Sequence, residues 1–385
     1  MVELSPWMQL GLKRGDVKMK RRDFLKASAV FAGAAAGGFT CVEFAGAAPI
    51  EAPVVDKLSV RVLVDLTHNI FLRPQTFKGM KVTPAARAKD YTKELHTQWG
   101  LSYFLESTKG GETRSLMLDY AYTPEALLNN IEIIGVEPKK LDALIVSHGH
   151  FDHYGGLIGF LDKYRSVLPA DVKLYAGGED NFCHRVQPTG TPGEFSDFGY
   201  LDRRALAARN VGVVLCESPT VIVGHAFTTG QIKRATDEKI LPNTFEQFGK
   251  TADGLGCDAS HYTPAELLGK IVPDEHYHEH ATIFNVKDRG LVVLSSCSHR
   301  GIVNATKQAM AVSGVNKVHA LLGGFHLGPA PTDYTKHVVT ELVALDPDIV
   351  VPMHCSGENF VEAMRDIAPD RLFIGSTGAM MTFGA

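Results

Sequence analysis

The 385-residue chain lacks an excess of basic residues, and it lacks any cysteine pair at CxxC spacing. Its formal net charge is −4 and its sequence pI is about 6.5. The chain has no excess of positive charge to neutralise a phosphate backbone, so nucleic acid is not an expected partner. The six cysteines are widely spaced, unlike those of a disulfide-rich domain, and we expect no disulfide. The composition, 45% hydrophobic and 21% charged, is instead that of an ordinary globular protein.

The first 48 residues differ in composition from the rest of the chain. Arg21 and Arg22 precede Phe24, and a weakly apolar run rich in alanine and glycine follows over residues 27–42. This order is typical of a signal peptide, and the paired arginines resemble a twin-arginine export signal. The Ala-Gly-Ala sequence at residues 45–47 offers a cleavage site.

An uncleaved membrane anchor is the alternative interpretation of this segment. It is disfavoured because the apolar run is rich in glycine and Glu43 interrupts it. We expect residues 1–48 to be an N-terminal extension with a signal peptide, and residues 49–385 to form one domain. The mature protein would be periplasmic or exported, with no membrane contact after signal removal.

After residue 48, short apolar runs alternate with helical patterns, which predicts helix layers around β-sheet. Residues 177–275 differ, because they are rich in Gly, Pro, Thr and charge, and we expect them to cover an active site. The expected strands lie at residues 59–65, 101–106, 114–119, 143–147, 172–176, 281–286, 290–296, 318–322 and 348–353, and the expected helices at 124–134, 155–167, 302–312 and 335–345.

The stretch His148-Gly149-His150-Phe151-Asp152-His153 places four potential metal ligands directly after an expected strand. On an extended segment alternate side chains point the same way, so His148 and His150 can bind one metal together. Asp152 and His153 would then face a second position. Imidazole and carboxylate groups suit zinc, iron or manganese, and two ions about 3.5–4 Å apart would share an activated hydroxide. We expect one or two Zn²⁺ ions, with Fe or Mn as alternatives.

The HxHxDH pattern after a strand resembles the metallo-β-lactamase superfamily. That resemblance implies an α/β fold, an αβ/βα four-layer sandwich, with metals at the edge of the sheets. Three further stretches, residues 296–304, 323–327 and 352–357, resemble the branch typified by dihydropterin-ribofuranosyl-aminobenzene-phosphate synthase. Together these patterns cover most of the mature chain.

The resemblance also implies roles for single residues. Asp119 matches an early aspartate that supports the ligand loop, and His354 would complete the shell of the second metal. His299 stands where many members carry a metal-bridging aspartate, and a neutral imidazole cannot bridge in that way, so the number of metals is open. The middle histidine of the pattern has no clean counterpart, and His225 is the nearest candidate.

Several further residues have two interpretations. His326 is either a metal ligand or, as we favour, a general acid or hydrogen-bond donor to substrate. Cys297 and Cys355 are either thiolate ligands or, as we favour, buried packing residues. The alternating histidines of residues 276–280 form either a third metal site or, as we favour, a solvated strand near the active-site mouth.

The basic residues Arg185, Lys233 and Arg234 of the expected cover have two interpretations as well. They hold a phosphate or carboxylate of the substrate, or they belong to a solvated loop, which is the favoured interpretation for any single one.

The leading prediction is a metal-dependent hydrolase with a small-molecule substrate. A metal-bound hydroxide would attack an ester, lactone, amide or phosphoester. Asp152 would orient the water, and His326 would act in general acid–base catalysis. A pterin-precursor synthase-like transferase is one alternative, and a non-catalytic periplasmic metal- or ligand-binding protein is another. The sequence indicates neither the substrate nor the oligomeric state. The expected metal ligands are His148, His150, Asp152, His153, His299 and His354.

Overall fold

The computed structural model describes residues 49–85, 88–241, 243–248, 257, 260, 263–264 and 271–384. The predicted signal segment and its cleavage site lie outside the described residues. Within the described ranges, no helix combines the length and the apolar character that crossing a membrane requires.

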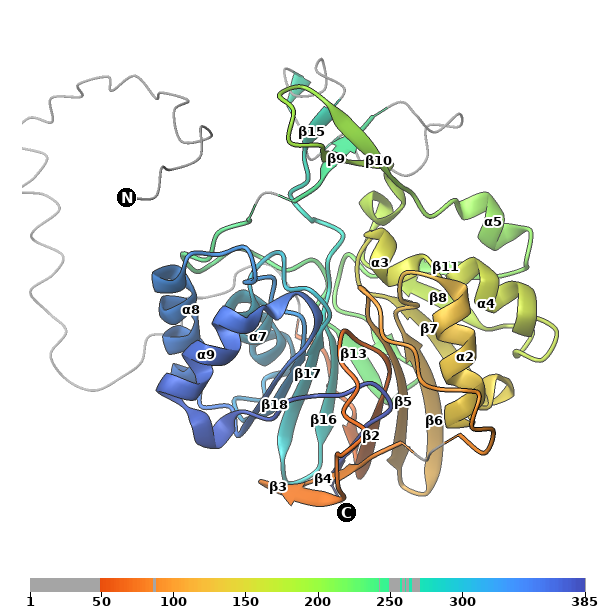
Figure 1. Ribbon diagram of the computed structural model, residues 1–385, viewed down its shortest axis with the longest axis vertical. Helices are drawn as coiled ribbons and strands as arrows, with labels where there is room; N and C mark the ends of the chain where they lie inside the picture. The colour runs from red at the N-terminus through yellow and green to blue at the C-terminus, as the bar shows by residue number, and fades with distance from the viewer. Residues whose placement is uncertain are drawn as a thin grey trace, which may run out of the picture. The chain divides into compact units, whose positions relative to one another are not determined.

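Two large β-sheets stand beside each other, with helices on their outer faces (Figure 1). The first sheet has the strand order β11-β8-β7-β6-β5-β2-β20-β4-β3, and the second β12-β13-β16-β17-β18-β19, with β1 added beside β16. The strands of the first sheet are β2 (Lys57–Val64), β3 (Gln75–Phe77), β4 (Met80–Thr83), β5 (Ser102–Lys109), β6 (Glu112–Leu118), β7 (Leu141–Val146), β8 (Lys173–Ala176), β11 (Gly212–Leu215) and β20 (Met380–Gly384). Those of the second are β1 (Val54–Val55), β12 (Val221–Ile222), β13 (Ala226–Thr228), β16 (Thr282–Val286), β17 (Gly290–Ser295), β18 (Val318–Gly323) and β19 (Ile349–Pro352).

Helices α2 (Pro124–Ile134), α3 (Phe151–Tyr154), α4 (Leu157–Tyr164) and α5 (Arg203–Ala207) lie on the side of the first sheet, and α7 (Ile302–Ser313), α8 (Thr332–Ala344) and α9 (Glu358–Ile367) lie beyond the second (Figure 1). Side chains such as Val60, Leu105 and Phe284 form one core cluster that includes both sheets. Two further clusters lie between each sheet and its own helices. Each fully buried large apolar side chain contributes about 1.5–3 kcal/mol to such cores. This arrangement confirms the predicted α/β sandwich.

Helix α2 shows how local sequence fixes an element of this frame. It begins at Pro124, whose fixed φ suits the first helical turn, and it ends at Gly135, which takes a left-handed backbone (φ 79°). Leu127 and Ile131, four residues apart, are buried against the first sheet.

A third, small sheet has the order β10-β9-β14-β15 and lies above the edge of the main sheets in Figure 1. Its strands are β9 (Arg185–Pro188), β10 (Phe195–Gly199), β14 (Phe245–Gln247) and β15 (Ile271–Pro273). The described part of residues 177–275 is therefore divided: this sheet stands apart, whereas β11, β12 and β13 join the two main sheets.

Cys183 and Cys257 form a disulfide, with 4.6 Å between their Cα atoms. The expectation of no disulfide is therefore wrong. The two cysteines are 74 residues apart in sequence, and their pairing depends on how the chain folds back rather than on any local spacing.

Candidate metal centre

The potential ligands collect at one edge of the two sheets because each follows the carboxyl end of a strand. The HxHxDH stretch follows β7, Cys297 and His299 follow β17, His326 follows β18, and His354 follows β19. Strands β17, β18 and β19 are parallel neighbours, so their carboxyl ends meet on the same side.

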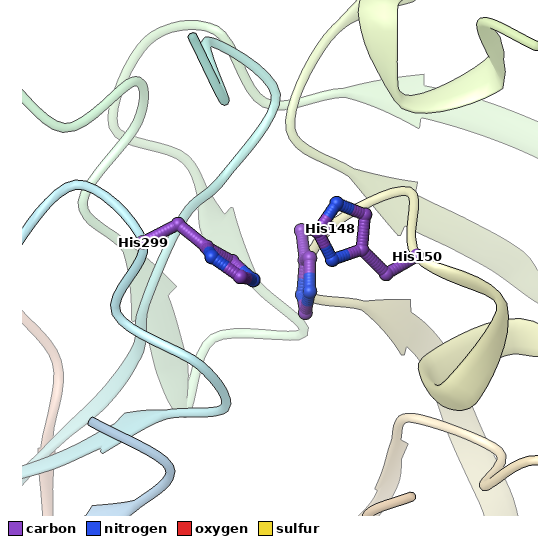
Figure 2. A group of neighbouring side chains, drawn as sticks. All are labelled: His148, His150 and His299. Carbon is purple, nitrogen blue, oxygen red and sulfur yellow. The ribbon is translucent and has the colours of Figure 1, made fainter. Parts of the chain in front are cut away.

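A first ligand group consists of His148, His150 and His299, whose ligand atoms all lie within 4.8 Å of one another. Figure 2 shows the rings of His148 and His150 approaching from one loop and the ring of His299 from a separate segment. The ring centroids are 4.6 Å apart for His148 and His150, and 5.0 Å apart for His148 and His299. All three side chains are buried.

A second group continues the cluster with mixed donors. His354 Nε2 lies 3.1 Å from Asp152 Oδ2 and 3.3 Å from His153 Nε2. Cys297 Sγ lies 3.2 Å from His153 Nε2, and Cys355 Sγ lies 3.3 Å from Cys297 Sγ. Cys297 also forms a potential ligand group with His148 and His153, so its sulfur connects the two groups.

The donors of this cluster fit a divalent cation. His148 Nε2 and both ring nitrogens of His299 are buried without a hydrogen-bond partner. A buried polar atom without a partner costs about 1–3 kcal/mol, which a bound ion would offset. Imidazole, thiolate and carboxylate together are the donors that zinc and its neighbours in the first transition row prefer.

Asp119 supports the ligand loop in the way the resemblance implies. Its carboxylate accepts hydrogen bonds from the Ser147 backbone N–H and from the Ser147 hydroxyl, each at 2.8 Å. It also lies 2.8 Å from His153 Nδ1. Because the Ser147 hydroxyl donates to Asp119, the 2.9 Å contact with His148 must have His148 Nδ1–H as the donor. The Nε2 atoms of both histidines are then left as acceptors that face the cluster.

Burial and neighbouring charges set the protonation of the cluster. Burial lowers the pKa of His148, His150, His276 and His299, which keeps these imidazoles neutral and able to bind metal. Burial also acts to lower the pKa of His354, but the neighbouring Cys355 and Asp152 outweigh it and raise that pKa to about 9.

Asp152 shows the opposite balance. Burial by itself would raise its pKa, whereas His153 and His354 hold the pKa well below its usual range. The carboxylate therefore stays ionised and able to bind a cation or to accept a proton from water.

His276 is a residue of the cluster that sequence reasoning missed. The interpretation of residues 276–280 as a solvated strand is wrong, because His276, His278 and His280 are all buried. The ring of His276 stacks on that of His299 at 4.2 Å between centroids, and neither of its ring nitrogens has a hydrogen-bond partner. Its ligand atom also groups with those of His150 and Asp274.

His225, the proposed middle histidine, lies outside this cluster. Its Nδ1 is 2.9 Å from the hydroxyl of Ser107 on β5. Ser102 is the first residue of β5 and lies at the end of the strand nearest the cluster, because its hydroxyl donates to the Asp119 carbonyl. Ser107 lies five residues farther along, roughly 16 Å away at the rise of a strand. The structure brings His276 rather than His225 to the cluster.

Cys297 and Cys355 are buried, as predicted, but their sulfurs lie within the cluster rather than facing away from it. Alternation of side chains requires extended backbone, but Ser298 (φ 58°) and His354 (φ 47°) take left-handed conformations. Both sulfurs consequently lie on the same side as the neighbouring histidines. The positive φ angles themselves have no signature in the sequence, because neither residue is glycine.

The cluster opens into a cavity of about 390 Å³. His326 lines it, with its ring 4.2 Å from that of His299 and its Nδ1 without a partner. Burial acts to lower the pKa of His326, but Cys355 outweighs it and raises that pKa above its usual value, which favours the protonated ring. The cavity is lined by Trp99, Tyr122, His150, Asp152, Gln187, Phe198, Asn243, Cys297, His299, His326, His354 and Cys355.

Known proteins resemble this chain in sequence and in structure. Residues 100–181 match the profile of the Metallo-beta-lactamase superfamily. A 7,8-dihydropterin-6-methyl-4-(beta-D-ribofuranosyl)-aminobenzene-5'-phosphate synthase of Methanocaldococcus jannaschii is 30% identical over 72% of this chain and 88% of its own length. An uncharacterized protein of the same organism is 24% identical over 69% of this chain and 86% of its own length.

The fold has a solved counterpart as well. The crystal structure of a metal-dependent hydrolase of the beta-lactamase superfamily superimposes with a TM-score of 0.60 and 18% identity, over 84% of this chain and 98% of the other. These findings confirm the resemblance drawn from the HxHxDH pattern and the three later stretches. The chain therefore belongs to the metallo-beta-lactamase superfamily, in the branch of the 7,8-dihydropterin-6-methyl-4-(beta-D-ribofuranosyl)-aminobenzene-5'-phosphate synthase.

Proposed function

We propose that the protein is a metal-dependent hydrolase acting on a small molecule with an aromatic or apolar part. The observation that carries the proposal is the shared cavity, in which Asp152 and His326 line the same space as His150 and His299 of the first ligand group. A metal site with acidic and basic groups inside a cavity of substrate size is the arrangement that hydrolysis requires.

Zn²⁺ is the proposed ion, held by His148, His150, His299 and His276, with a second position at Asp152, His153, His354 and Cys297. Iron and manganese are the alternatives, and the buried sulfur of Cys297 favours zinc or iron over manganese. A bound divalent ion lowers the pKa of water towards 7 and stabilises a developing oxyanion.

The residues of the chain supply the remaining chemistry. The ionised Asp152 accepts a hydrogen bond from the attacking water and orients it. His326, held in its protonated form, donates its proton to the leaving group. Trp99, Tyr122 and Phe198 form aromatic walls of the cavity and pack against the planar or apolar part of the substrate.

A transferase like the methanogen relative is the second candidate. It is favoured by 30% identity over most of both chains and by the aromatic walls, which suit a pterin or aminobenzene ring. In such a reaction the amine nitrogen of an aminobenzene forms a bond to the methylene carbon of a dihydropterin. The leaving group departs with its electron pair, and the amine loses a proton, for which Asp152 is the available base.

Two assays on the purified, metal-loaded protein separate the candidates. One uses generic ester, lactone and phosphodiester substrates, and the other pairs an activated dihydropterin with a ribofuranosyl-aminobenzene phosphate. Hydrolysis that falls at least about 100-fold in Asp152→Asn supports the first proposal. Adduct formation without hydrolysis supports the second. Ligand binding without turnover in either assay, with a ligand affinity that changes in His326→Gln, would instead identify a binding protein.

We propose in addition that the protein is exported. The paired Arg21 and Arg22 support this proposal, and so does the disulfide, because disulfides persist in oxidising compartments. Cell fractionation should find the wild-type chain in the periplasm and a variant with both Arg21→Lys and Arg22→Lys in the cytoplasm. Equal distribution of the two chains would contradict export by this route.

A further inference from the structure

Arg185, at the start of β9, is a buried arginine whose guanidinium is fully engaged. Its Nε donates to Asp274 Oδ2 at 2.7 Å, and its Nη1 donates to the carbonyls of Gly149 and Cys183 at 3.1 and 2.9 Å. Its Nη2 donates to the Asp180 carbonyl at 2.6 Å and to Glu246 Oε1 at 3.0 Å. These contacts use all five N–H donors of the group. Arg185 is therefore not a solvated loop residue, and its guanidinium has no donor left to bind a phosphate or carboxylate of the substrate.

The contact with Gly149 reaches the centre of the ligand loop. Gly149 lies between His148 and His150, and its backbone N–H donates to His278 Nδ1 at 3.0 Å. A Cβ atom at position 149 would lie 2.5 Å from Arg185 Nη1 and 2.4 Å from the Asn181 carbonyl. The guanidinium therefore packs directly on the backbone that sets the spacing of the two ligand histidines.

The contact with Asp274 connects Arg185 to His150. Asp274 Oδ2, which accepts from Arg185, also accepts from the hydroxyl of Thr244 at 3.1 Å. That hydroxyl has one hydrogen, so the 2.9 Å contact between Thr244 and His150 must have His150 Nε2–H as the donor. The chain of bonds fixes the tautomer of His150 and leaves its Nδ1 as the acceptor.

Asp274 connects the same guanidinium to His276. Its other oxygen, Oδ1, accepts from the backbone N–H of His276 at 2.8 Å and lies 3.3 Å from His278 Nε2. The Oδ1 contact fixes the turn in which His276 takes a left-handed backbone (φ 55°). Two ligand segments that are more than 120 residues apart thus depend on one carboxylate and one guanidinium.

The small sheet places these groups by its register. Glu246 on β14 pairs with Arg185 on β9, and β15 ends one residue before Asp274. Thr244 directly precedes β14. Strands β9, β14 and β15 thereby place Arg185, its partners Asp274 and Glu246, and Thr244 beside the ligand loop.

We infer that Arg185 is a positioning residue for the metal centre, which holds His150 and His276 in their metal-binding geometry through Gly149 and Asp274. The inference rests on the proposed metal site. It assigns the small sheet a role in building the centre as well as in covering it.

Arg185→Lys tests the inference, because lysine keeps the positive charge but cannot reproduce the five-donor fork. Arg165→Lys is the matched control: Arg165 also donates to several loop carbonyls, those of residues 168, 169, 170, 209 and 210, but none belongs to the centre. Affinity for Co²⁺ is measured by competition with a chelator, and the visible absorption of the cobalt protein reports ligand geometry. Arg185→Lys should bind Co²⁺ about 10- to 100-fold more weakly with an altered spectrum, and Arg165→Lys should match the wild type in both.

Wild-type cobalt affinity and spectrum in folded Arg185→Lys would overturn the inference and leave the proposed function standing. Failure of the wild-type protein to bind Co²⁺ would overturn both. Where Arg185→Lys does not fold, Glu246→Gln weakens the same network while keeping the shape of the side chain. An affinity loss of several-fold in that variant supports the inference, and an unchanged affinity overturns it.

Discussion

Left-handed backbone occurs at four residues in the turns that build the centre. His276 (φ 55°), Ser298 (φ 58°), His326 (φ 42°) and His354 (φ 47°) all take positive φ angles, which cost a non-glycine residue about 1–2 kcal/mol each. These conformations turn adjacent side chains towards the same point, so that Cys297 and His299, or His354 and Cys355, can both face the cluster. Metal binding would offset this cost in free energy, so a bound ion would stabilise these turns.

His276→Ala should remove the fourth proposed ligand of the ion that His148, His150 and His299 would hold. We expect metal affinity to fall by at least about tenfold, because the remaining His148, His150 and His299 must hold the ion without it. Equilibrium dialysis against Zn²⁺ measures the change, and His225→Ala is the control, since His225 lies outside the cluster. Equal zinc binding by His276→Ala and wild type would exclude His276 from the centre.

Cys297→Ser should change the electronic spectrum of the centre as well as its affinity. A cobalt-loaded wild-type protein is expected to show thiolate-to-metal charge-transfer absorption in the near ultraviolet, and the variant should lose it. Cys216→Ser is the control, because Cys216 is a buried free cysteine that belongs to none of the potential ligand groups described above. Because Cys355 lies in the same cluster, Cys355→Ser is measured beside it: a band that persists unchanged in Cys297→Ser and is lost in Cys355→Ser would show that the Cys297 sulfur does not bind the metal.

At the scale of elements, regular strands and helices with strong apolar patterns were predictable. The Thr123-Pro124 start and the Gly135 stop place α2 correctly at Pro124–Ile134, and the apolar run before His148 corresponds to β7. The grouping of His148, His150 and His299 was also predictable, because they sit where strands end.

The elements that sequence reasoning missed have weaker local signals or special backbone. Strands β14 and β15 are three residues long, too short for alternation to appear, and they exist because β9 pairs with β14. The period-two interpretation of residues 276–280 failed because the positive φ of His276 makes a turn there. Helix α9 has a usable signal, the spacing of Phe360, Ala363 and Met364.

The β7–α3 connection has little room for a larger side chain at Gly149. In Gly149→Ala the new methyl group would meet the Asn181 carbonyl at 2.4 Å, so the ligand loop must shift. We expect a loss of about 1–3 kcal/mol in the free energy of unfolding together with weaker metal binding. Denaturant titration and zinc dialysis measure the two effects. Gly212→Ala is the control, since its methyl group would have no neighbour closer than 4.0 Å, and wild-type behaviour of Gly149→Ala would contradict the packing of this loop.

At the scale of the whole molecule, burial of histidine couples stability to pH. Burial lowers the pKa of six histidines in and around the cluster, that of His278 to about 3. The folded protein therefore binds fewer protons than the unfolded chain, and this contribution to stability is complete above pH 6.5 and lost as the pH falls towards 3. Raised pKa values oppose this trend: burial raises that of Glu279 to about 7, Cys355 and Asp152 raise that of His354 to about 9, and Cys355 raises that of His326. These groups stabilise the fold as the pH falls, but the histidines with lowered pKa values outnumber them. The six histidines are His148, His150, His276, His278, His280 and His299.

The metal-free protein should accordingly lose stability between about pH 7.5 and about pH 5. Urea titrations at the two pH values give the free energies of unfolding, and His278→Gln, which cannot titrate, should show a smaller difference than wild type. A metal-free protein that is equally stable at both pH values would contradict neutral burial of these histidines.

The sandwich brings strand ends from two sheets to one edge, and the central claim is that this edge is a metal centre built on the HxHxDH stretch. Metal quantification on purified, untagged wild-type protein tests it most directly, beside His148→Ala and His225→Ala. The account predicts at least about one equivalent of a transition metal in wild type and in His225→Ala, and loss of both metal and activity in His148→Ala. A wild-type protein that takes up no metal, or a His148→Ala variant that keeps full metal content and activity, would contradict it.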